Sequence, residues 1–242
     1  MKVAARPVAV AEIASLRELY RAEMACQIVH DSLHVRPGWT EAHLLEVDGA
    51  TAGYGSLAVA GPWTGSRVIF EWYVQPSLRV RAFDLFECLV ETSRATGMEI
   101  QSNDALITAM LHAYAHSIKS ESIVFADGMV TEHPANGALV TKRNAEATEC
   151  VLEVDGADAG NGGILYHYNR PYGDIYMEIA EPFRRRGYGS YLVQELKRIC
   201  RELGSVPCAR CNPGNVASRR TLQKAGFVPC GHILVGTLGV GA

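Results

Sequence analysis

Apolar and polar positions along this chain recur with two different periods, which predict helices and strands in turn. Near-helical spacing of apolar residues predicts helices over 8–30 and 80–96. Between these helices, 44–49 and 51–59 have the pattern of a hairpin, because an Asp-Gly turn joins two strand-like runs. The β-rich run 68–74 predicts a further strand. The first half of the chain is therefore expected to be α+β.

The same order of elements then recurs, which indicates an internal repeat. Residues 151–160, Val-Leu-Glu-Val-Asp-Gly-Ala-Asp-Ala-Gly, closely match 44–53, Leu-Leu-Glu-Val-Asp-Gly-Ala-Thr-Ala-Gly. We expect two copies of one α+β unit, a domain over 1–126 and a second over 127–242, whose opening helices are short or missing. The other expected elements are short strands at 99–102 and 122–125 and a helix at 104–116, then a strand at 175–179, a helix at 191–203, a strand at 206–211, a helix at 216–225 and a strand at 228–235.

A glycine-bearing basic turn separates the strand at 175–179 from the helix that follows it. Its sequence at 182–190 is Pro-Phe-Arg-Arg-Arg-Gly-Tyr-Gly-Ser. A helix N-terminus offers unpaired N–H groups and a partial positive charge, and glycine lets that backbone approach a phosphate closely. The turn therefore predicts an anion site.

The first copy differs from the second at this turn. When Pro76 is aligned with Pro182, Arg81 falls at the position of Gly187, and Phe83 falls at that of Gly189. Large side chains in both places would keep a phosphate away from the backbone. We expect the first copy to have lost the anion site and to be structural, or to form one wall of the substrate cleft.

Charge is distributed unevenly along a chain whose net charge is −3. Residues 182–224 hold 10 Lys and Arg residues but only 2 Asp and Glu residues. Such a region suits a phosphorylated small molecule or nucleic acid, or is a solvated basic helix face. The seven cysteines are an odd number, which favours reduced thiols over a disulfide framework. With no membrane-length apolar run and no signal pattern, a cytoplasmic protein is expected.

Two motifs in the second copy identify the anion. Residues 179–189, with Arg184, Gly187 and Gly189 at a strand-to-helix turn, resemble motif A of the GNAT superfamily of acyl-CoA-dependent N-acetyltransferases. Residues 215–227, in which an Asn opens a helix that ends in Gly-Phe, are similar to motif B of that superfamily. The resemblance implies tandem GNAT-like domains, each a mixed, mostly antiparallel sheet flanked by helices. It covers about 127–235, and the first copy only through the repeat.

The resemblance also implies acetyl-CoA as co-substrate, with its pyrophosphate on the N–H groups of the basic turn. The pantetheine arm would pair with main-chain groups of Ile179 and Ala180, one of which would polarise the thioester carbonyl. Arg219 or Arg220 would reach a phosphate or lie on a solvated helix face. The expected cofactor-binding residues are Ile179, Ala180, Arg184, Arg185, Arg186, Gly187, Tyr188, Gly189, Ser190, Asn215 and Ser218.

Acetyl transfer to an amine needs a proton acceptor, for which Glu178 is the candidate catalytic residue. Alternation along a strand places Glu178 with Tyr176 and Ala180 on one face, opposite Met177 and Ile179. Apolar neighbours would favour a neutral carboxyl and suit it to accept a proton near neutral pH. A substrate-binding or structural carboxylate is the other interpretation.

The general acid departs from the superfamily pattern, because Leu222 stands where many members have a Tyr on the motif B helix. Tyr166, Tyr168, Tyr172 or solvent would then protonate the leaving thiolate. The aromatic loop 166–172 is also a candidate for contact with the acceptor.

The expected function is acetyl transfer from acetyl-CoA to a small-molecule or peptide amine by direct attack. A non-catalytic acyl-CoA-binding or regulatory protein is the alternative. We expect no nucleic-acid or membrane partner, and a homodimer is compatible with the sequence. We expect no metal either, since Cys208 and Cys211 fall on opposite faces of a predicted strand.

Overall fold

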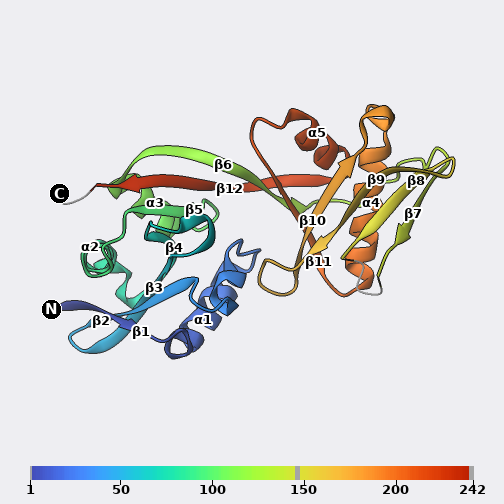
Figure 1. Ribbon diagram of the computed structural model, residues 1–242. Helices are drawn as coiled ribbons and strands as arrows, with labels where there is room; N and C mark the ends of the chain where they lie inside the picture. The colour runs from blue at the N-terminus through green and yellow to red at the C-terminus, as the bar shows by residue number, and fades with distance from the viewer. Residues whose placement is uncertain (1, 145–147, 240–242) are drawn as a thin grey trace. The chain divides into compact units, whose positions relative to one another are not determined.

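The computed structural model describes residues 2–144 and 148–239, which divide into two compact units (Figure 1). The first unit comprises Met1–Glu121 and His232–Ala242, and the second comprises Ser122–Gly231. The expected boundary between 126 and 127 concerns the sequence repeat and stays a prediction. The division by packing differs from the repeat in one respect, because the C-terminal segment of the chain belongs to the first unit.

The sheet of the first unit has the strand order β1-β2-β3-β4-β5-β12. Its pairings are antiparallel except that of β4 with β5, which is parallel. The hairpin predicted around Asp48-Gly49 is confirmed as β2 and β3. The strands are β1 (Val3–Val8), β2 (Thr40–Val47), β3 (Ala50–Ala58), β4 (Val68–Val74), β5 (Gly97–Gln101) and β12 (Phe227–Leu238), of which the part from His232 onward belongs to this unit.

The helices of the first unit are shorter than their periodicity predicted. The expected helix over 8–30 is a 3-10 turn, η1 (Val10–Ile13), and then α1 (Ala14–Met24), which ends because Ala25 adopts a left-handed conformation at φ 48°. The helix over 80–96 is likewise trimmed by left-handed Arg94, at φ 53°. The remaining elements are η2 (Asp31–Val35), η3 (Gly61–Trp63), η4 (Pro76–Arg81), α2 (Ala82–Ser93) and α3 (Ala105–Tyr114).

The two faces of the first sheet are covered by different helices. Residues of α2 and α3 pack with Leu45, Trp72 and Met98 in one apolar cluster. Residues of α1 pack on Tyr54 and Tyr73, from β3 and β4, in another. A sheet covered on both faces needs apolar residues at successive strand positions, as in the run Val-Ile-Phe-Glu-Trp-Tyr-Val of β4.

The sheet of the second unit has the order β7-β8-β9-β10-β11-β6. Strand β7 was not predicted, because its five residues have no alternation and lie outside the repeated hairpin. The described chain between β6 and β7 contains no helix, which confirms that the second copy lacks the opening helices. The elements are β6 (Ala115–Asp127), β7 (Ala138–Lys142), β8 (Cys150–Val154), β9 (Ala157–Leu165), β10 (Tyr172–Ile179), η5 (Glu181–Phe183), α4 (Tyr188–Glu202), β11 (Val206–Cys211) and α5 (Val216–Lys224).

The last strands of the two repeats are exchanged. Strand β6 follows α3 in the first copy, yet its residues Ile123–Ala126 pair with β11 of the second unit. Strand β12 follows α5 in the second copy, yet Ile233–Thr237 pair with β5 of the first unit. The short strand predicted at 122–125 is therefore the end of a longer one. Each unit completes its sheet with a strand from the other repeat.

Candidate active site

The turn between β10 and α4 combines two left-handed residues with a basic sequence. Arg185 has φ 63°, and Gly187, the residue just before α4, has φ 90°. No atom lies within 4 Å of a Cβ built on Gly187, so its conformation and not crowding requires glycine there. The two left-handed residues turn the chain away from the η5 helix and start α4 anew.

Backbone N–H groups along this turn are available to a ligand. The N–H groups of Ser190 and Tyr191 donate to Gly187 O. No acceptor among the described residues takes the N–H groups of 185–187, just ahead of the helix start. Unpaired donors at the positive end of a helix bind anions, so the predicted anion site has the required geometry.

Strand β10 separates from β11 beside the turn. The two strands pair in parallel only over Tyr172–Asp174, while β10 pairs with β9 as far as Ile179. The Ala180 N–H donates to Ala159 O, so Ala180 faces β9. By strand alternation, Ile179 presents its N–H to the open side, where its carbonyl accepts from Arg184 Nε at 2.8 Å. Of the two expected main-chain partners, Ile179 is the one that faces the separation.

A cavity of about 1140 Å³, the large cavity, lies between this turn and α5. Four cations line it (Arg184, Arg185, Arg220 and Lys224) against two carboxylates, Glu178 and Glu181, so its charge suits an anionic ligand. The structure brings these predicted residues together on its wall: Glu178, Ile179, Arg184, Arg185, Gly187, Gly189, Ser190, Asn215 and Ser218.

Three predicted cofactor residues are not part of the lining of the large cavity. Arg186 is exposed outside the lining, and Ala180 lines a different cavity. Tyr188 is buried and its hydroxyl donates to Asn136 O at 3.4 Å. The sequence analysis did not predict several residues of the lining, among them Met177, Phe183, Val216, Ala217 and Thr221. Only the last three had a signal in the sequence, which was their helical spacing along α5.

Helix α5 is fixed against the large cavity by its cap and by a close approach to α4. The Asn215 side chain accepts from the Ser218 N–H at 3.0 Å and so caps the helix. A Cβ on Gly189 would lie 3.2 Å from the Thr221 methyl group. Gly189 therefore allows the two helices to pack closely, a role distinct from the phosphate approach predicted for it.

The position expected to hold a general acid does not face the large cavity. Leu222 is buried in the core of the second unit. Tyr166, Tyr168 and Tyr172 line neither cavity described in this unit, so the structure does not bring the aromatic loop to the site. Tyr168 lies beside Asp174, and burial raises the pKa of that hydroxyl.

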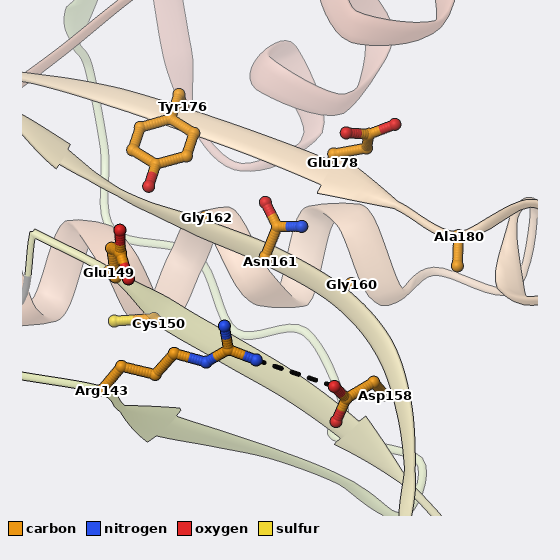
Figure 2. A pocket seen from close by; sticks show the side chains of 10 residues that line it. All are labelled: Arg143, Glu149, Cys150, Asp158, Gly160, Asn161, Gly162, Tyr176, Glu178 and Ala180. Atoms are coloured by element: carbon orange, nitrogen blue, oxygen red, sulfur yellow. Dashed lines mark ion pairs between the residues drawn. The ribbon is translucent and has the colours of Figure 1, made fainter.

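Glu178 lies at the junction of two cavities. It lines the large cavity and also a second one of about 340 Å³, the small cavity, on the face of β8–β10 shown in Figure 2. Tyr176 and Ala180 line the small cavity with it, whereas Met177 and Ile179 pack on the opposite core, as the alternation predicted. The apolar enclosure expected around Glu178 is wrong, because its side chain is exposed.

Residues 110–227 match the model of the acetyltransferase (GNAT) family, so this segment is a GNAT acetyltransferase domain. Three similar solved structures match nearly the whole chain. An acetyltransferase of the GNAT family from Colwellia psychrerythraea has a TM-score of 0.74 and 13% identity, covering 99% of this chain and 100% of that one. A GCN5-related N-acetyltransferase from Sphaerobacter thermophilus has a TM-score of 0.64 and 15% identity, covering 99% and 97%.

The third structure is a tandem GNAT protein from the clavulanic acid biosynthesis pathway, with a TM-score of 0.65, 14% identity and full coverage of both chains. Together these matches confirm the predicted tandem GNAT-like fold. No curated protein sequence matches the chain significantly.

No described helix is long and apolar enough to cross a membrane. The described residues contain no group of three or more His, Cys, Asp and Glu arranged to hold a metal ion.

Proposed function

We propose that the second unit transfers an acetyl group from acetyl-CoA to a primary amine by direct attack in a ternary complex. The observation that carries the proposal is the position of Glu178, which borders both the large, cation-lined cavity and the small one. A carboxylate at that junction can reach an amine in one cavity and an acyl donor in the other. The GNAT family of this segment supports acyl transfer.

The large cavity fits acetyl-CoA in its charge and in its backbone. The pyrophosphate would lie on the N–H groups of 185–187, with Arg184, Arg185 and Arg220 adding charge-assisted contacts. The pantetheine arm would enter the separation of β10 from β11 and pair with Ile179. Acetyl-CoA supplies the activated acyl group and a good leaving thiolate.

Protein groups would then promote the attack in two ways. The Ile179 N–H would stabilise the negative charge that develops on the carbonyl oxygen. Glu178 would take the proton from the attacking amine, directly or through a water molecule. Since no tyrosine lines the large cavity among the described residues, the leaving thiolate would take its proton from solvent.

Glu178→Gln tests the proposal. It should lower kcat for acetylation at least about a hundredfold, measured as CoA release over a panel of amines, and leave the Kd for acetyl-CoA within about twofold. Glu132→Gln, an exposed acid of the same unit outside both cavities, should change neither quantity. Unchanged activity in Glu178→Gln would remove Glu178 as the base.

A non-catalytic acyl-CoA-binding protein is the second candidate, favoured by the burial of Leu222 where many members have a Tyr. Acetyl-CoA would then bind to the wild-type chain, yet no amine of the panel would release CoA. Absence of both binding and transfer would exclude both candidates.

A further inference from the structure

The two units differ in what covers one face of the sheet. Strand register pairs Tyr54 with Tyr73 in the first unit, and pairs Asn161 with Glu178 at the matching place in the second. The two tyrosines are buried beneath α1, where Tyr20 lies 6.4 Å and 6.0 Å from their ring centroids. The face that is closed in one unit is exposed in the other.

No helix among the described residues of the second unit takes the place of α1. The described chain between β6 and β7 is non-helical, and Asn161 and Glu178 are both exposed. Helix α4 packs on the opposite face of these strands, against Ile175 and Ile179. The small cavity lies on the uncovered face (Figure 2).

Acidic side chains dominate the small cavity. Glu149, Asp158 and Glu178 line it against a single cation, Arg143. Arg143 lies 3.7 Å from Asp158 and so offsets that charge. Glu149 lies just ahead of β8, and Glu178 lies near the end of β10. Neither carboxylate has an ion pair with any described residue. Two carboxylates without an ion-pair partner among the described residues therefore line one cavity.

We propose that the small cavity binds a small amine that carries a second cationic nitrogen, so that the acceptor is a diamine or polyamine. The proposal rests on the proposed function, because it treats the small cavity as the acceptor site. The reacting nitrogen lies beside Glu178, which also borders the large cavity, and the distal ammonium group lies beside Glu149. Each cation then lies beside a carboxylate that has no ion-pair partner among the described residues, which gives charge complementarity at both ends.

The dimensions of the cavity favour a small molecule over a protein surface. Its volume of about 340 Å³ lies at the lower end of the range for small-ligand sites. The rest of its wall is made of short or planar groups, including Gly160, Gly162 and Asn161, that leave the carboxylates accessible. The Tyr176 hydroxyl donates to Thr148 O at 3.2 Å, which holds the ring against the segment that carries Glu149.

Three acceptors with the same number of carbon atoms test the proposal on the full chain. They are 1,5-diaminopentane, pentylamine and 5-aminopentanoate, which end in a cation, a methyl group and an anion. With acetyl-CoA saturating, kcat/KM should fall in that order, by about tenfold from the diamine to the monoamine. Titration calorimetry with CoA present should give the same order of Kd, so binding is measured apart from transfer.

Glu149→Gln should lower the preference for diamine over monoamine about tenfold in both measurements. Glu153→Gln, further along β8 and outside both cavities, should leave the preference unchanged. Equal kcat/KM for the diamine and the monoamine would overturn the proposal and leave acetyl transfer standing. Preferential diamine binding without transfer to any amine would uphold this site and refute the proposed function. Absence of both would overturn both.

Discussion

The two strand-to-helix turns, β4 to α2 and β10 to α4, differ in whether the residues ahead of the helix continue one helical path or leave backbone N–H groups unpaired. In the first unit, η4 continues almost directly into α2, and Arg81 before the helix has φ −105°. In the second, left-handed Arg185 and Gly187 interrupt the path between η5 and α4. The framework is shared, and the difference lies in whether the turn is wound into a helix or holds its N–H groups open.

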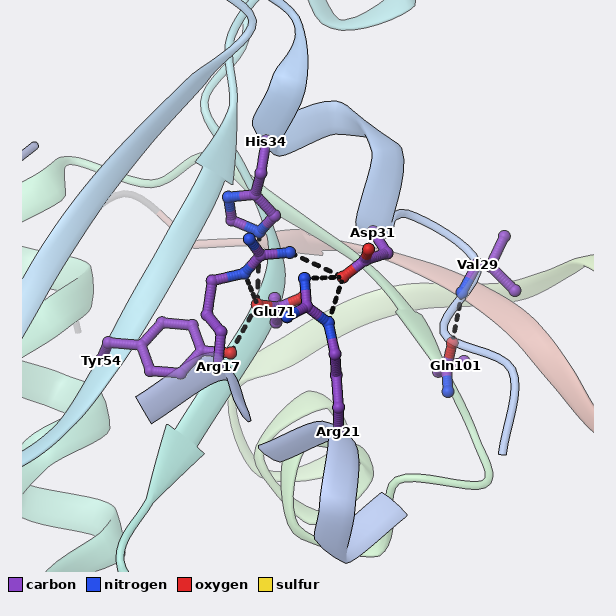
Figure 3. A network of polar contacts seen from close by, with 8 residues as sticks. All are labelled: Arg17, Arg21, Val29, Asp31, His34, Tyr54, Glu71 and Gln101. Atoms are coloured by element: carbon purple, nitrogen blue, oxygen red, sulfur yellow. Dashed lines mark hydrogen bonds and ion pairs between the residues drawn. The ribbon is translucent and has the colours of Figure 1, made fainter. Parts of the chain in front are cut away.

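One face of the sheet also differs between the two units, because it is buried in the first unit and accessible in the second. In the first unit, the fully buried carboxylate of Glu71 accepts from the Tyr54 hydroxyl, and its Oε1 lies 3.2 Å from both Arg17 Nε and His34 Nε2 (Figure 3). Asp31 joins Arg17 to Arg21 beside it. Burial would raise the pKa of Glu71, but these partners together lower it to about 2. In the second unit, strand register places Tyr176 at the position equivalent to Glu71, and Tyr176 lines the small cavity. One copy uses this face for packing, and the other leaves it accessible.

Gly187→Arg should have the largest effect, since it gives the second turn the residue of the first. A non-glycine residue at φ 90° costs about 1–2 kcal/mol or forces the turn to rewind. If the turn rewinds, the open N–H groups are lost; if it does not, the Arg side chain beside them hinders the close approach of a phosphate. We expect the Kd for acetyl-CoA to rise at least about a thousandfold, measured by titration calorimetry, with the circular dichroism spectrum retained.

Arg81→Gly makes the reverse change in the first unit and is the matched control. Because η4 leads into α2 without a left-handed residue, glycine alone does not open that turn. The stoichiometry of acetyl-CoA should remain one per chain and the Kd unchanged. A second binding event in Arg81→Gly, or normal binding in Gly187→Arg, would break the comparison between the two turns.

Glu71→Gln should have the next largest effect, on the stability of the first unit. Removing one partner of a buried ion pair leaves Arg17 and His34 without their common acceptor, which should lower the free energy of unfolding by about 3 kcal/mol at pH 7. All three tryptophans, Trp39, Trp63 and Trp72, lie in this unit, so tryptophan fluorescence in urea reports its unfolding.

The pH dependence of Glu71→Gln follows from the lowered pKa of the carboxyl. Its ionised form stabilises the folded state above the ordinary pKa of 4.5, and that contribution is lost as pH falls toward about 2. The difference between wild type and variant should therefore shrink over this window. Glu46→Gln, which removes the exposed pair with Arg6, should cost less than about 1 kcal/mol at any pH. A constant difference from pH 7 to pH 2 would contradict the assignment.

The sequence was sufficient for features set by local patterns. The Asp-Gly turns, the alternation of β10 and the glycine turn before α4 each have a local signature, because period and backbone conformation act within a few residues. The meeting of the basic turn with the start of α5 at one cavity was implied by the resemblance to motifs A and B and not by a local pattern.

Features that depend on long-range packing were not predictable. Strands β6 and β12 could each pair with an equivalent sheet edge in either repeat. The residue pattern of each strand does not indicate which of the two sheets it joins. The exposure of Glu178 depends on a helix that the second copy lacks, and the small cavity depends on Glu149 and Asp158, which were not singled out. Arg186 and Tyr188 have the right positions in the motif but point elsewhere.

Asn215→Ala should have the smallest effect, and it sharpens the comparison between the equivalent helices α5 and α3. Loss of the side-chain cap on α5 should lower stability by about 1 kcal/mol, and disorder of the helix start beside the large cavity should raise the Kd for acetyl-CoA about tenfold. Asp104 caps α3 in the first unit, accepting from the Leu106 and Ile107 N–H groups. Asp104→Ala should lower stability at least as much, measured by urea unfolding, yet leave the Kd unchanged. A rise in Kd in both variants would mean that the first unit also contributes to cofactor binding, and the division of roles between the two copies would fail.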